Sequence, residues 1–334
     1  MRMMAAGLTA LLTVLGAGVA EAHHQQLVLA LPGPLGARFA GYYVADYQGF
    51  YDEGEVAVRI VPGDAAAPPM QALTNGEANI VVATLPEALA LREQGLPLVN
   101  VGQIFKHSGM GLTCRKDAGI AAAADLKGKK LGLWRHGDPY PLRAWLAELG
   151  LKPDGSAGGV TLLDQGDGVD LLVQGQADCI STATYDQALQ LADAGLGPEE
   201  LVVFDYATAG VATLADGLYV PASALEDEDY VQTLGAFLHH TMRGWLWAQE
   251  NPVEAARIVL EYDTARALTE KRQVRIMEAV NLLTAGSTGA PVPEDYRHTL
   301  AVLRAARATA RLPEPPASAM SESVARAANL TTLF

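Results

Sequence analysis

The residues from Leu27 to Gly63 combine apolar runs with glycine and proline breaks in an order that constrains the fold. The apolar run 27–31 is followed by a Pro-Gly pair, and an aromatic-rich stretch spans 39–51. β-Branched residues then recur at every second position, at Val56, Val58 and Ile60. Short apolar runs bounded by turn residues and such a two-residue period both predict β-strands. The order of strand, loop, helix and strand predicts the start of an α/β sheet.

Length and composition allow a protein of two packed lobes. The chain has 334 residues, of which 50% are hydrophobic and 19% are charged, and single domains commonly contain about 100–150 residues. The formal net charge is −14, which argues against a nucleic-acid partner because binding phosphates needs a face rich in Lys and Arg.

The first 22 residues have the features of an export signal. Arg2 gives a positive start, an apolar stretch runs from Ala5 to Ala20, and Ala20-Glu21-Ala22 has the small residues of a cleavage site. The apolar stretch is shorter than the about 20 residues of a membrane-spanning helix. No cysteine lies near the cleavage site to carry a lipid. We therefore expect residues 1–22 to be a signal peptide and the mature protein to be periplasmic.

Two strand–helix units further along the chain resemble each other. Residues 78–83 form a continuous apolar run, and Thr84 and Glu87 have the spacing of a capping box at the start of a helix. The sequence Gly-Glu-Ala-Asn at 76–79 is echoed by Gly-Gln-Ala-Asp at 175–178, which also precedes a predicted strand and helix. This repetition predicts two similar lobes that face each other.

The segments FAGYYVADYQGFYDEGEVAVRIVPG from Phe39, ADLKGKKLGLW from Ala124 and DCISTATYDQ from Asp178 resemble the periplasmic substrate-binding proteins of ABC importers. The similar branch is the one related to thiamine-pyrimidine synthases. The resemblance implies a two-lobed α/β fold of the type II periplasmic binding proteins, each lobe a sheet flanked by helices. Lobe 1 would comprise 23–111 and 213–334 and lobe 2 would comprise 112–212, with crossovers near 111–115 and 208–214.

A pocket between two lobes needs a stacking surface and a few polar groups, and the predicted loops and helix starts supply both. Trp134 and Tyr185 follow strands at the edge where open α/β sheets bind ligands. Carboxylates there would accept hydrogen bonds from ring amino groups, and Thr84 and Thr182 would bracket the cleft. The predicted ligand-binding residues are Phe39, Tyr42, Thr84, Trp134, Asp138, Tyr140, Thr182, Tyr185 and Asp205.

Structural roles remain open for the same residues. Aromatic side chains commonly pack in cores, which we favour for Tyr43 and Phe50. Asp186 is a candidate helix cap, and Asp138 and Asp205 are candidate loop carboxylates. Three arginines would clamp an anionic ligand or would simply lie on the surface: Arg115, Arg135 and Arg143.

Cys114 and Cys179 are the two cysteines of the chain. An oxidising compartment permits a disulfide between them, but we interpret them as two separate buried side chains in strands. Two cysteines cannot form a metal cluster, and there is neither a GxxxxGK[ST] phosphate loop nor a G-x-S-x-G elbow. We expect no metal and no cofactor.

These observations predict a monomeric binding protein, not an enzyme, that closes over one small ligand and delivers it to an ABC permease in the inner membrane. The resemblance implies a flat nitrogen heterocycle, a thiamine-precursor pyrimidine or a riboflavin-like molecule. The alternatives are a sulfonate such as taurine, a pyrimidine synthase-like enzyme on the same fold, and the sensing domain of a receptor.

Overall fold

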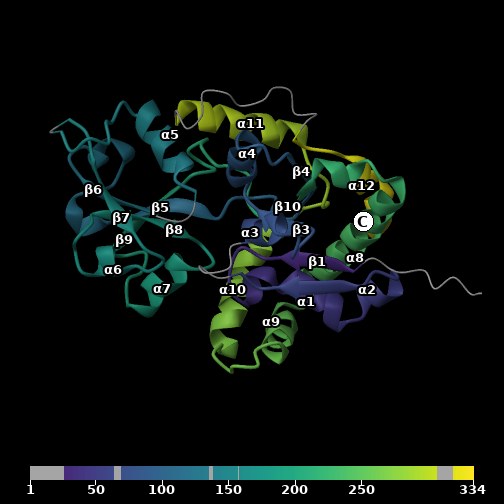
Figure 1. Cartoon of the computed structure of the whole chain (residues 1–334). Helices are drawn as coiled ribbons and strands as arrows, with labels where there is room; N and C mark the ends of the chain where they lie inside the picture. The colour runs from purple at the N-terminus through teal and green to yellow at the C-terminus, as the bar shows by residue number, and fades with distance from the viewer. Residues whose placement is uncertain (1–25, 64–68, 135–137, 157, 307–318) are drawn as a thin grey trace, which may run out of the picture.

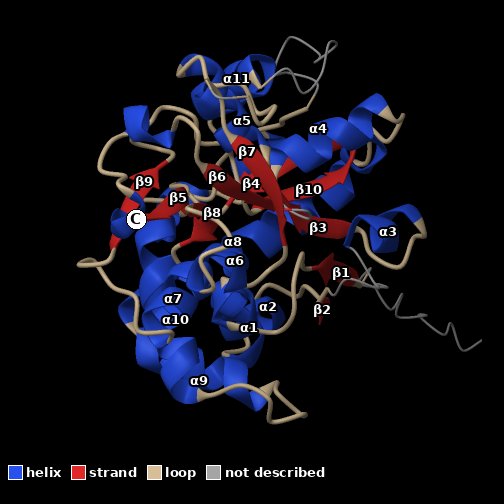
Figure 2. Cartoon of the chain, turned by 90° about the vertical axis from the view of Figure 1, so that its left-hand side faces the viewer, coloured by secondary structure: helices blue, strands red, loops and turns tan. Residues whose placement is uncertain are grey.

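The computed structural model describes residues 26–63, 69–134, 138–156, 158–306 and 319–334. The described residues form two five-stranded sheets, each flanked by helices (Figures 1 and 2). We call the half with the first sheet lobe 1 and the half with the second sheet lobe 2. This arrangement confirms the predicted two-lobed α/β fold. The predicted signal peptide lies outside the described residues.

The sheet of lobe 1 is mixed. Strands β1 and β2 are parallel, as are β1 and β3, whereas β10 enters between β3 and β4 and runs antiparallel to both. In spatial order the strands are β2 (Val58–Val61), β1 (Leu27–Ala30), β3 (Ile80–Ala83), β10 (Gly217–Pro221) and β4 (Leu98–Gln103).

The sheet of lobe 2 repeats this topology. Strand β6 is parallel to β7 and β8, and β5 enters between β8 and β9 in the antiparallel direction. In spatial order the strands are β7 (Thr161–Gln165), β6 (Lys130–Trp134), β8 (Cys179–Ala183), β5 (Met110–Arg115) and β9 (Leu201–Asp205). In each lobe the antiparallel strand, β10 or β5, is the first strand after the chain crosses from the other lobe.

Most helices belong to lobe 1. They are α1 (Ala40–Tyr47), α2 (Phe50–Glu53), α3 (Pro69–Thr74), α4 (Leu85–Glu93), α8 (Glu228–Glu250), α9 (Pro252–Glu261), α10 (Glu270–Thr284), α11 (Pro293–Ala305) and α12 (Ser323–Ala327). Lobe 2 contains α5 (Tyr140–Glu148), α6 (Asp170–Val173) and α7 (Gln187–Asp193). Within the described part of the chain, no helix has the length and apolarity that crossing a bilayer requires.

Hydrogen bonds confirm the two echoed units. In lobe 1 the side chain of Asn79 accepts from Val28 N at 2.7 Å, and in lobe 2 the side chain of Asp178 accepts from Lys130 N at 2.7 Å. The predicted capping box is also present, because Thr84 Oγ1 accepts from Glu87 N while the Glu87 carboxylate accepts from Thr84 N. Each polar side chain thus satisfies a backbone group at a strand or helix start.

Lobe 1 has the larger core. One apolar cluster lies between its sheet and helices α1 and α8, and a second lies on the other face, under α4 and α11. Helices α1 and α8 cross closely because Gly41 faces the Trp245 ring and Gly244 faces the Gly41 carbonyl, where an added Cβ would lie 2.1 and 2.2 Å from these neighbours. Glycine is therefore required at this crossing.

The chain passes between the sheets twice, through 104–109 and through 206–216. The second passage includes the predicted crossover at 208–214. The first precedes β5, so the prediction of a crossover at 111–115 is wrong: those residues pair with β8 and β9 inside lobe 2. The polypeptide changes lobes before the strand and not along it.

The C-terminal segment is packed against lobe 1. Met320 forms a β-bridge with Asn100 of β4, and α12 packs on α8 with Val324 and Ala328 in the main cluster of lobe 1. Apolar residues spaced along 319–330 explain this burial.

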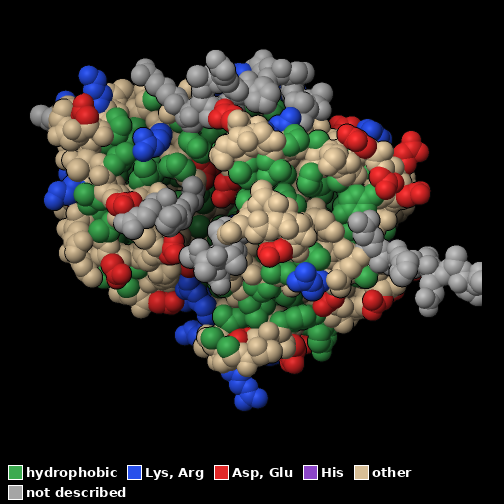
Figure 3. All heavy atoms as spheres, in the orientation of Figure 1, with side chains coloured by type: hydrophobic (Ala, Val, Ile, Leu, Met, Phe, Trp, Pro, Cys, Tyr) green, Lys and Arg blue, Asp and Glu red, His purple; other side chains and the backbone are tan. Residues whose placement is uncertain are grey.

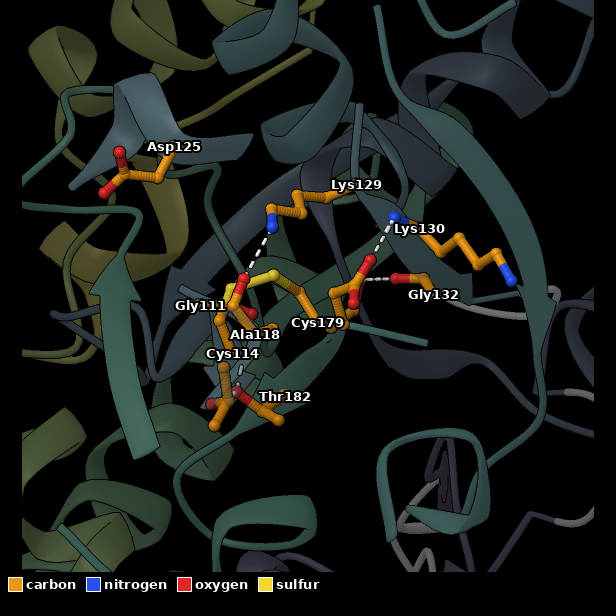
Figure 4. The surroundings of a disulfide bond; sticks show 12 residues. Gly111, Cys114, Ala118, Asp125, Lys129, Lys130, Gly132, Cys179 and Thr182 are labelled. Carbon is orange, nitrogen blue, oxygen red and sulfur yellow. Dashed lines mark hydrogen bonds between the residues drawn. A yellow bond between two sulfur atoms is a disulfide. The ribbon is translucent and has the colours of Figure 1, made fainter. Parts of the chain in front are cut away.

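The interpretation of the cysteines as separate thiols is wrong. Cys114 of β5 and Cys179 of β8 face each other in register, with Cα atoms 3.9 Å apart, and form a disulfide (Figure 4). Both residues are fully buried. Their pairing follows from the antiparallel alignment of β5 with β8, which a separation of 65 residues in the sequence does not reveal.

Candidate ligand-binding site

Side chains from both lobes meet where the chain passes between the sheets. Arg38, which precedes α1 in lobe 1, donates from Nε and Nη2 to the carboxylate of Asp216 at 2.9 and 2.5 Å. Its guanidinium carbon also lies 4.8 Å from the centre of the Tyr185 ring of lobe 2, within the range of a cation–π contact. We call Arg38, Asp138, Tyr185 and Asp216, with the adjacent Glu87, the inter-lobe cluster.

The charge on Arg38 is held in place by its neighbours. Burial opposes the charge, but Asp216, Tyr185 and Glu87 together raise the pKa of the guanidinium. Asp216 itself is almost fully buried and has a left-handed backbone with φ of 50°, a conformation that Asp tolerates better than most residues. The Arg38–Asp216 pair is therefore a fixed, neutral unit at the junction of the lobes.

Asp138 brings a second buried carboxyl group to the cluster from lobe 2. Only 8% of the residue is exposed. Its carboxylate accepts from the Thr213 hydroxyl in the second passage and from Tyr140 N at 3.0 Å. Burial raises the pKa of Asp138 to about 6, against these two hydrogen bonds, and the charge of Glu87 adds to the rise.

Acidic charge dominates this cluster among the described residues. Arg38 is already neutralised by Asp216, whereas Asp138 and Glu87 bond to hydroxyl and backbone groups and pair with no described cation. Figure 3 shows a recess between the two halves of the molecule with acidic side chains inside it. A group that donates N–H bonds or carries positive charge would be stabilised there.

Tyr185 is the predicted aromatic that most clearly joins the two lobes. It belongs to the turn between β8 and α7 of lobe 2, yet it packs against the core of lobe 1, with its ring 6.3 Å from that of Phe105. Burial raises the pKa of its hydroxyl to about 12, so the phenol is neutral at physiological pH.

Trp134 and Tyr140 flank Asp138. Trp134 ends β6, is partly buried and belongs to none of the hydrophobic clusters. Tyr140 begins α5 in lobe 2 but packs against the second cluster of lobe 1. Both rings therefore lie on the segments that enter and leave the Asp138 loop, and ligand contact by either remains a prediction.

Phe39 and Tyr42 lie in the core of lobe 1. Phe39 is 2% exposed, and Tyr42 is 1% exposed with its ring edge-on to Trp245 at 5.5 Å. Phe39 still lies beside the cluster, since the Arg38 guanidinium is 5.1 Å from its ring centre. Their burial in the present structure assigns both rings a packing role.

The two threonines do not face each other across a cleft. Thr84 caps α4 beside Glu87 in lobe 1, but Thr182 is buried inside the sheet of lobe 2, where its hydroxyl lies 2.8 Å from that of Thr113. The residue equivalent to Thr84 in the echoed unit is Ala183, whose N–H is capped by Gln187. The Thr182 hydroxyl is thus bonded within the sheet of lobe 2, and a role for Thr182 in bracketing the cleft stays a prediction.

Asp205 is used by its own loop. Its carboxylate accepts from Thr208 N at 2.6 Å, directly after β9. Of the arginines considered as anion clamps, Arg115 pairs with Asp117 and Arg143 is exposed on α5, while Arg135 lies outside the described residues. Among the described residues, no group of three or more His, Cys, Asp or Glu is placed to hold a metal ion.

Arg38 and Asp216 were not among the residues predicted from the sequence. Neither residue belongs to the strand and helix-cap motifs described from the sequence, and their ion pair joins positions 178 residues apart. The one local signal was the position of Arg38 directly before Phe39, which was itself a predicted ligand-binding residue. No sequence pattern indicated that Asp216 would meet it.

A cavity of about 200 Å³ lies next to the passages between the lobes. Its walls are residues 105–108, 207 and 212–215 together with part of α11. None of the nine predicted residues lines it, but Thr213 belongs both to this wall and to the inter-lobe cluster through Asp138. The cavity thus shares one hydrogen-bonded residue with the inter-lobe cluster.

Comparison with protein families identifies the chain. A family described as NMT1/THI5 like matches residues 37–255, well over half of the chain and the part that holds all five residues of the inter-lobe cluster. The protein belongs to the NMT1/THI5-like family. This family membership agrees with the resemblance found in the sequence, namely to proteins related to thiamine-pyrimidine synthases.

One relative and several solved structures are similar to this protein. A Haemophilus influenzae protein, provisionally named a thiamine biosynthesis protein, is 33% identical over 94 residues, which cover 28% of this chain and 30% of that protein. The ligand-binding component of an ABC-type import system from Staphylococcus aureus is 13% identical with a TM-score of 0.66, over 92% of this chain and 99% of that one.

Two further structures show how widely the fold is used. The periplasmic aliphatic sulphonate binding protein of Escherichia coli is 15% identical with a TM-score of 0.65, over 85% of this chain and 86% of that one. The desulfurization enzyme DSZB is 16% identical with a TM-score of 0.58, over 91% and 99% of the two chains. The periplasmic binding protein fold is therefore shared by binding proteins and by an enzyme.

Proposed function

We propose that this NMT1/THI5-like protein is the periplasmic solute-binding component of an ABC importer. It would act as a monomer that captures a small flat heterocycle, a thiamine-precursor pyrimidine or a riboflavin-like molecule, between the lobes and passes it to an inner-membrane permease. The family, the fold and the ABC-import neighbour support the general role. The relative named for thiamine biosynthesis supports the pyrimidine.

The buried carboxyl of Asp138 is the observation that carries the choice of ligand. A carboxylate in a site of low polarity forms strong bonds to N–H donors, and the pyrimidine edge of such a heterocycle presents them. Trp134, which ends the strand before the Asp138 loop, would provide a stacking face. A sulfonate would instead need cationic donors, and the guanidinium described in this cluster is already committed to Asp216.

A binding screen tests the proposal. We expect an aminopyrimidine precursor of thiamine or riboflavin to raise the unfolding midpoint, since a ligand that binds the folded state alone stabilises it, and taurine to leave it unchanged. Replacing Trp134→Ala should weaken binding by about 1–3 kcal/mol if the ring stacks on the ligand. Tyr47→Ala, which removes an exposed aromatic of α1, is the control.

Stabilisation by taurine but by neither heterocycle would contradict the ligand class. Equal binding by the Trp134→Ala and Tyr47→Ala variants would remove the stacking role of Trp134.

An enzyme on the same fold is the second candidate, because the desulfurization enzyme shares it. A pyrimidine synthase-like activity would consume pyridoxal phosphate. The absorbance spectrum of the purified protein, mixed with pyridoxal phosphate, would reveal a lysine adduct if this candidate were correct.

A further inference from the structure

We propose that Arg272 and Arg275 of α10 are positioning residues for the ligand site: they pull the Tyr185 turn of lobe 2 against lobe 1 and so favour the closed state without touching ligand. The inference rests on the proposed function in one respect, that ligand binds between the lobes.

Ion pairs join α10 of lobe 1 to lobe 2 at two acidic residues. Arg272 Nη2 lies 3.2 Å from Asp186 Oδ1, and Arg272 Nη1 lies 3.0 Å from Asp193 Oδ2. Arg275 also pairs with Asp193. Asp186 directly follows Tyr185, and Asp193 ends α7, so both arginines hold the segment that presents the Tyr185 ring. Figure 2 shows α7 next to α10.

Hydrogen bonds fix the turn that contains Tyr185 and Asp186, so a contact to Asp186 also positions Tyr185. The carboxylate of Asp186 accepts from the side-chain amides of Gln187 and Gln190 at 2.9 Å each, and Gln187 also accepts from Ala183 N at 3.0 Å. Arg272 donates to the backbone carbonyl of Asp186 as well, at 3.2 Å. Moving Asp186 therefore moves Tyr185 with it.

Lobe 1 holds this turn from two sides. On one side Arg38 contacts the face of the Tyr185 ring, and on the other side Arg272 bonds to Asp186. The lobes are also joined through α11, whose Val302 packs in the core of lobe 2 while Leu300 and Leu303 pack in lobe 1. In Figure 1, α11 lies at the top of the molecule and α10 at the bottom, so the ion pairs are on the side away from this packed connection.

The strength of these ion pairs suits a reversible contact. The four charged side chains remain between 23% and 54% exposed, and exposed ion pairs contribute little individually and weaken in salt. Together they would shift the ratio of closed to open molecules by about fivefold. A contact of this size favours closure but still permits release of ligand.

Distance measurements between spin labels test the proposal without any ligand. Labels at Lys152→Cys in lobe 2 and Glu261→Cys in lobe 1 occupy exposed sites, and the native cysteines are bonded to each other. We expect the Arg272→Gln/Arg275→Gln variant at low salt, and the otherwise unchanged protein in 1 M NaCl (a Debye length of about 3 Å), both to gain a longer distance. Arg257→Gln, which breaks ion pairs within lobe 1 alone, should not.

Binding measurements supply a second readout. The Arg272→Gln/Arg275→Gln variant should bind each ligand identified by the screen more weakly by the same factor, at most about fivefold, because closure costs the same for every ligand. Identical distance distributions in this variant and in Arg257→Gln would overturn the proposal. Failure to find a heterocyclic ligand would contradict the proposed function. The distance measurements would still test the role of the ion pairs, because they need no ligand.

Discussion

Lobe 1 packs apolar clusters against both faces of its sheet, whereas lobe 2 has smaller clusters and a disulfide across two central strands. Their strand order is the same, so topology does not account for the difference. The number of helices does: lobe 1 receives α8 to α12 from the C-terminal part of the chain, and lobe 2 receives none of them except the end of α11. A lobe that buries less apolar surface gains more from a covalent link.

The lobes also contribute different side chains to the inter-lobe cluster. Lobe 1 supplies Arg38 and the capped helix start with Glu87, and lobe 2 supplies Tyr185 and the buried carboxyl of Asp138. The carboxylate of Glu87 in lobe 1 is exposed, and the carboxyl of Asp138 in lobe 2 is buried. Similar folds thus present a carboxylate in two environments, and burial raises the pKa of the Asp138 carboxyl.

Removing the disulfide should cause the largest change in the stability of lobe 2 relative to lobe 1. The bond closes a loop of 65 residues, for which chain entropy predicts a loss of about 4 kcal/mol in the free energy of unfolding. Replacing Cys114→Ala and Cys179→Ala should therefore unfold lobe 2 first and separate the denaturant transition into two steps. Tryptophan fluorescence and circular dichroism would detect them.

A single transition with unchanged midpoint in the double variant would show that lobe 2 does not depend on the disulfide.

The pH dependence of stability should distinguish Asp138 from Glu87. Folding raises the pKa of Asp138 from 3.8 to about 6, so the folded state favours the protonated acid. Its contribution is complete below pH of about 4 and is lost as the pH rises through about 6, by up to about 3 kcal/mol. Asp138→Asn should remove this loss, whereas Glu87→Gln should reduce it only slightly, because burial is the larger cause of the raised pKa.

Chemical unfolding of both variants and of the unchanged protein between pH 4 and 8 gives this comparison. If the Asp138→Asn variant keeps the same pH dependence as the unchanged protein, the carboxyl is not the buried acid described here.

Local patterns in the sequence predicted much of the fold. The strand predicted within 78–83, the capping box at Thr84 and the echo between Asn79 and Asp178 depend on neighbouring residues. The structure contains all three, with the strand at Ile80–Ala83. The disulfide, by contrast, depends on the register between strands far apart in the chain. Burial of the C-terminal segment likewise depends on the surface of α8 that it covers.

The candidate site was predicted in part for the same reason. Asp138 and Tyr185 follow strands of lobe 2, where the edge of a sheet marks a site, and both lie in the inter-lobe cluster. The burial of Thr182 was not predicted, because a one-residue shift along a strand moves a side chain to the opposite face. Arg38 meets Asp216 only once the lobes are assembled.

Calorimetric titration of the protein with an aminopyrimidine precursor of thiamine, and separately with taurine, tests the central claim most directly. We expect the pyrimidine to bind between the lobes and taurine not to bind. Asp138→Asn should weaken pyrimidine binding by about tenfold or more, because a charge-assisted hydrogen bond is lost. Asp205→Asn, which changes a carboxylate bonded to its own loop, should bind as before. Binding of taurine alone, or equal affinity of the Asp138→Asn and Asp205→Asn variants for the pyrimidine, would contradict the account.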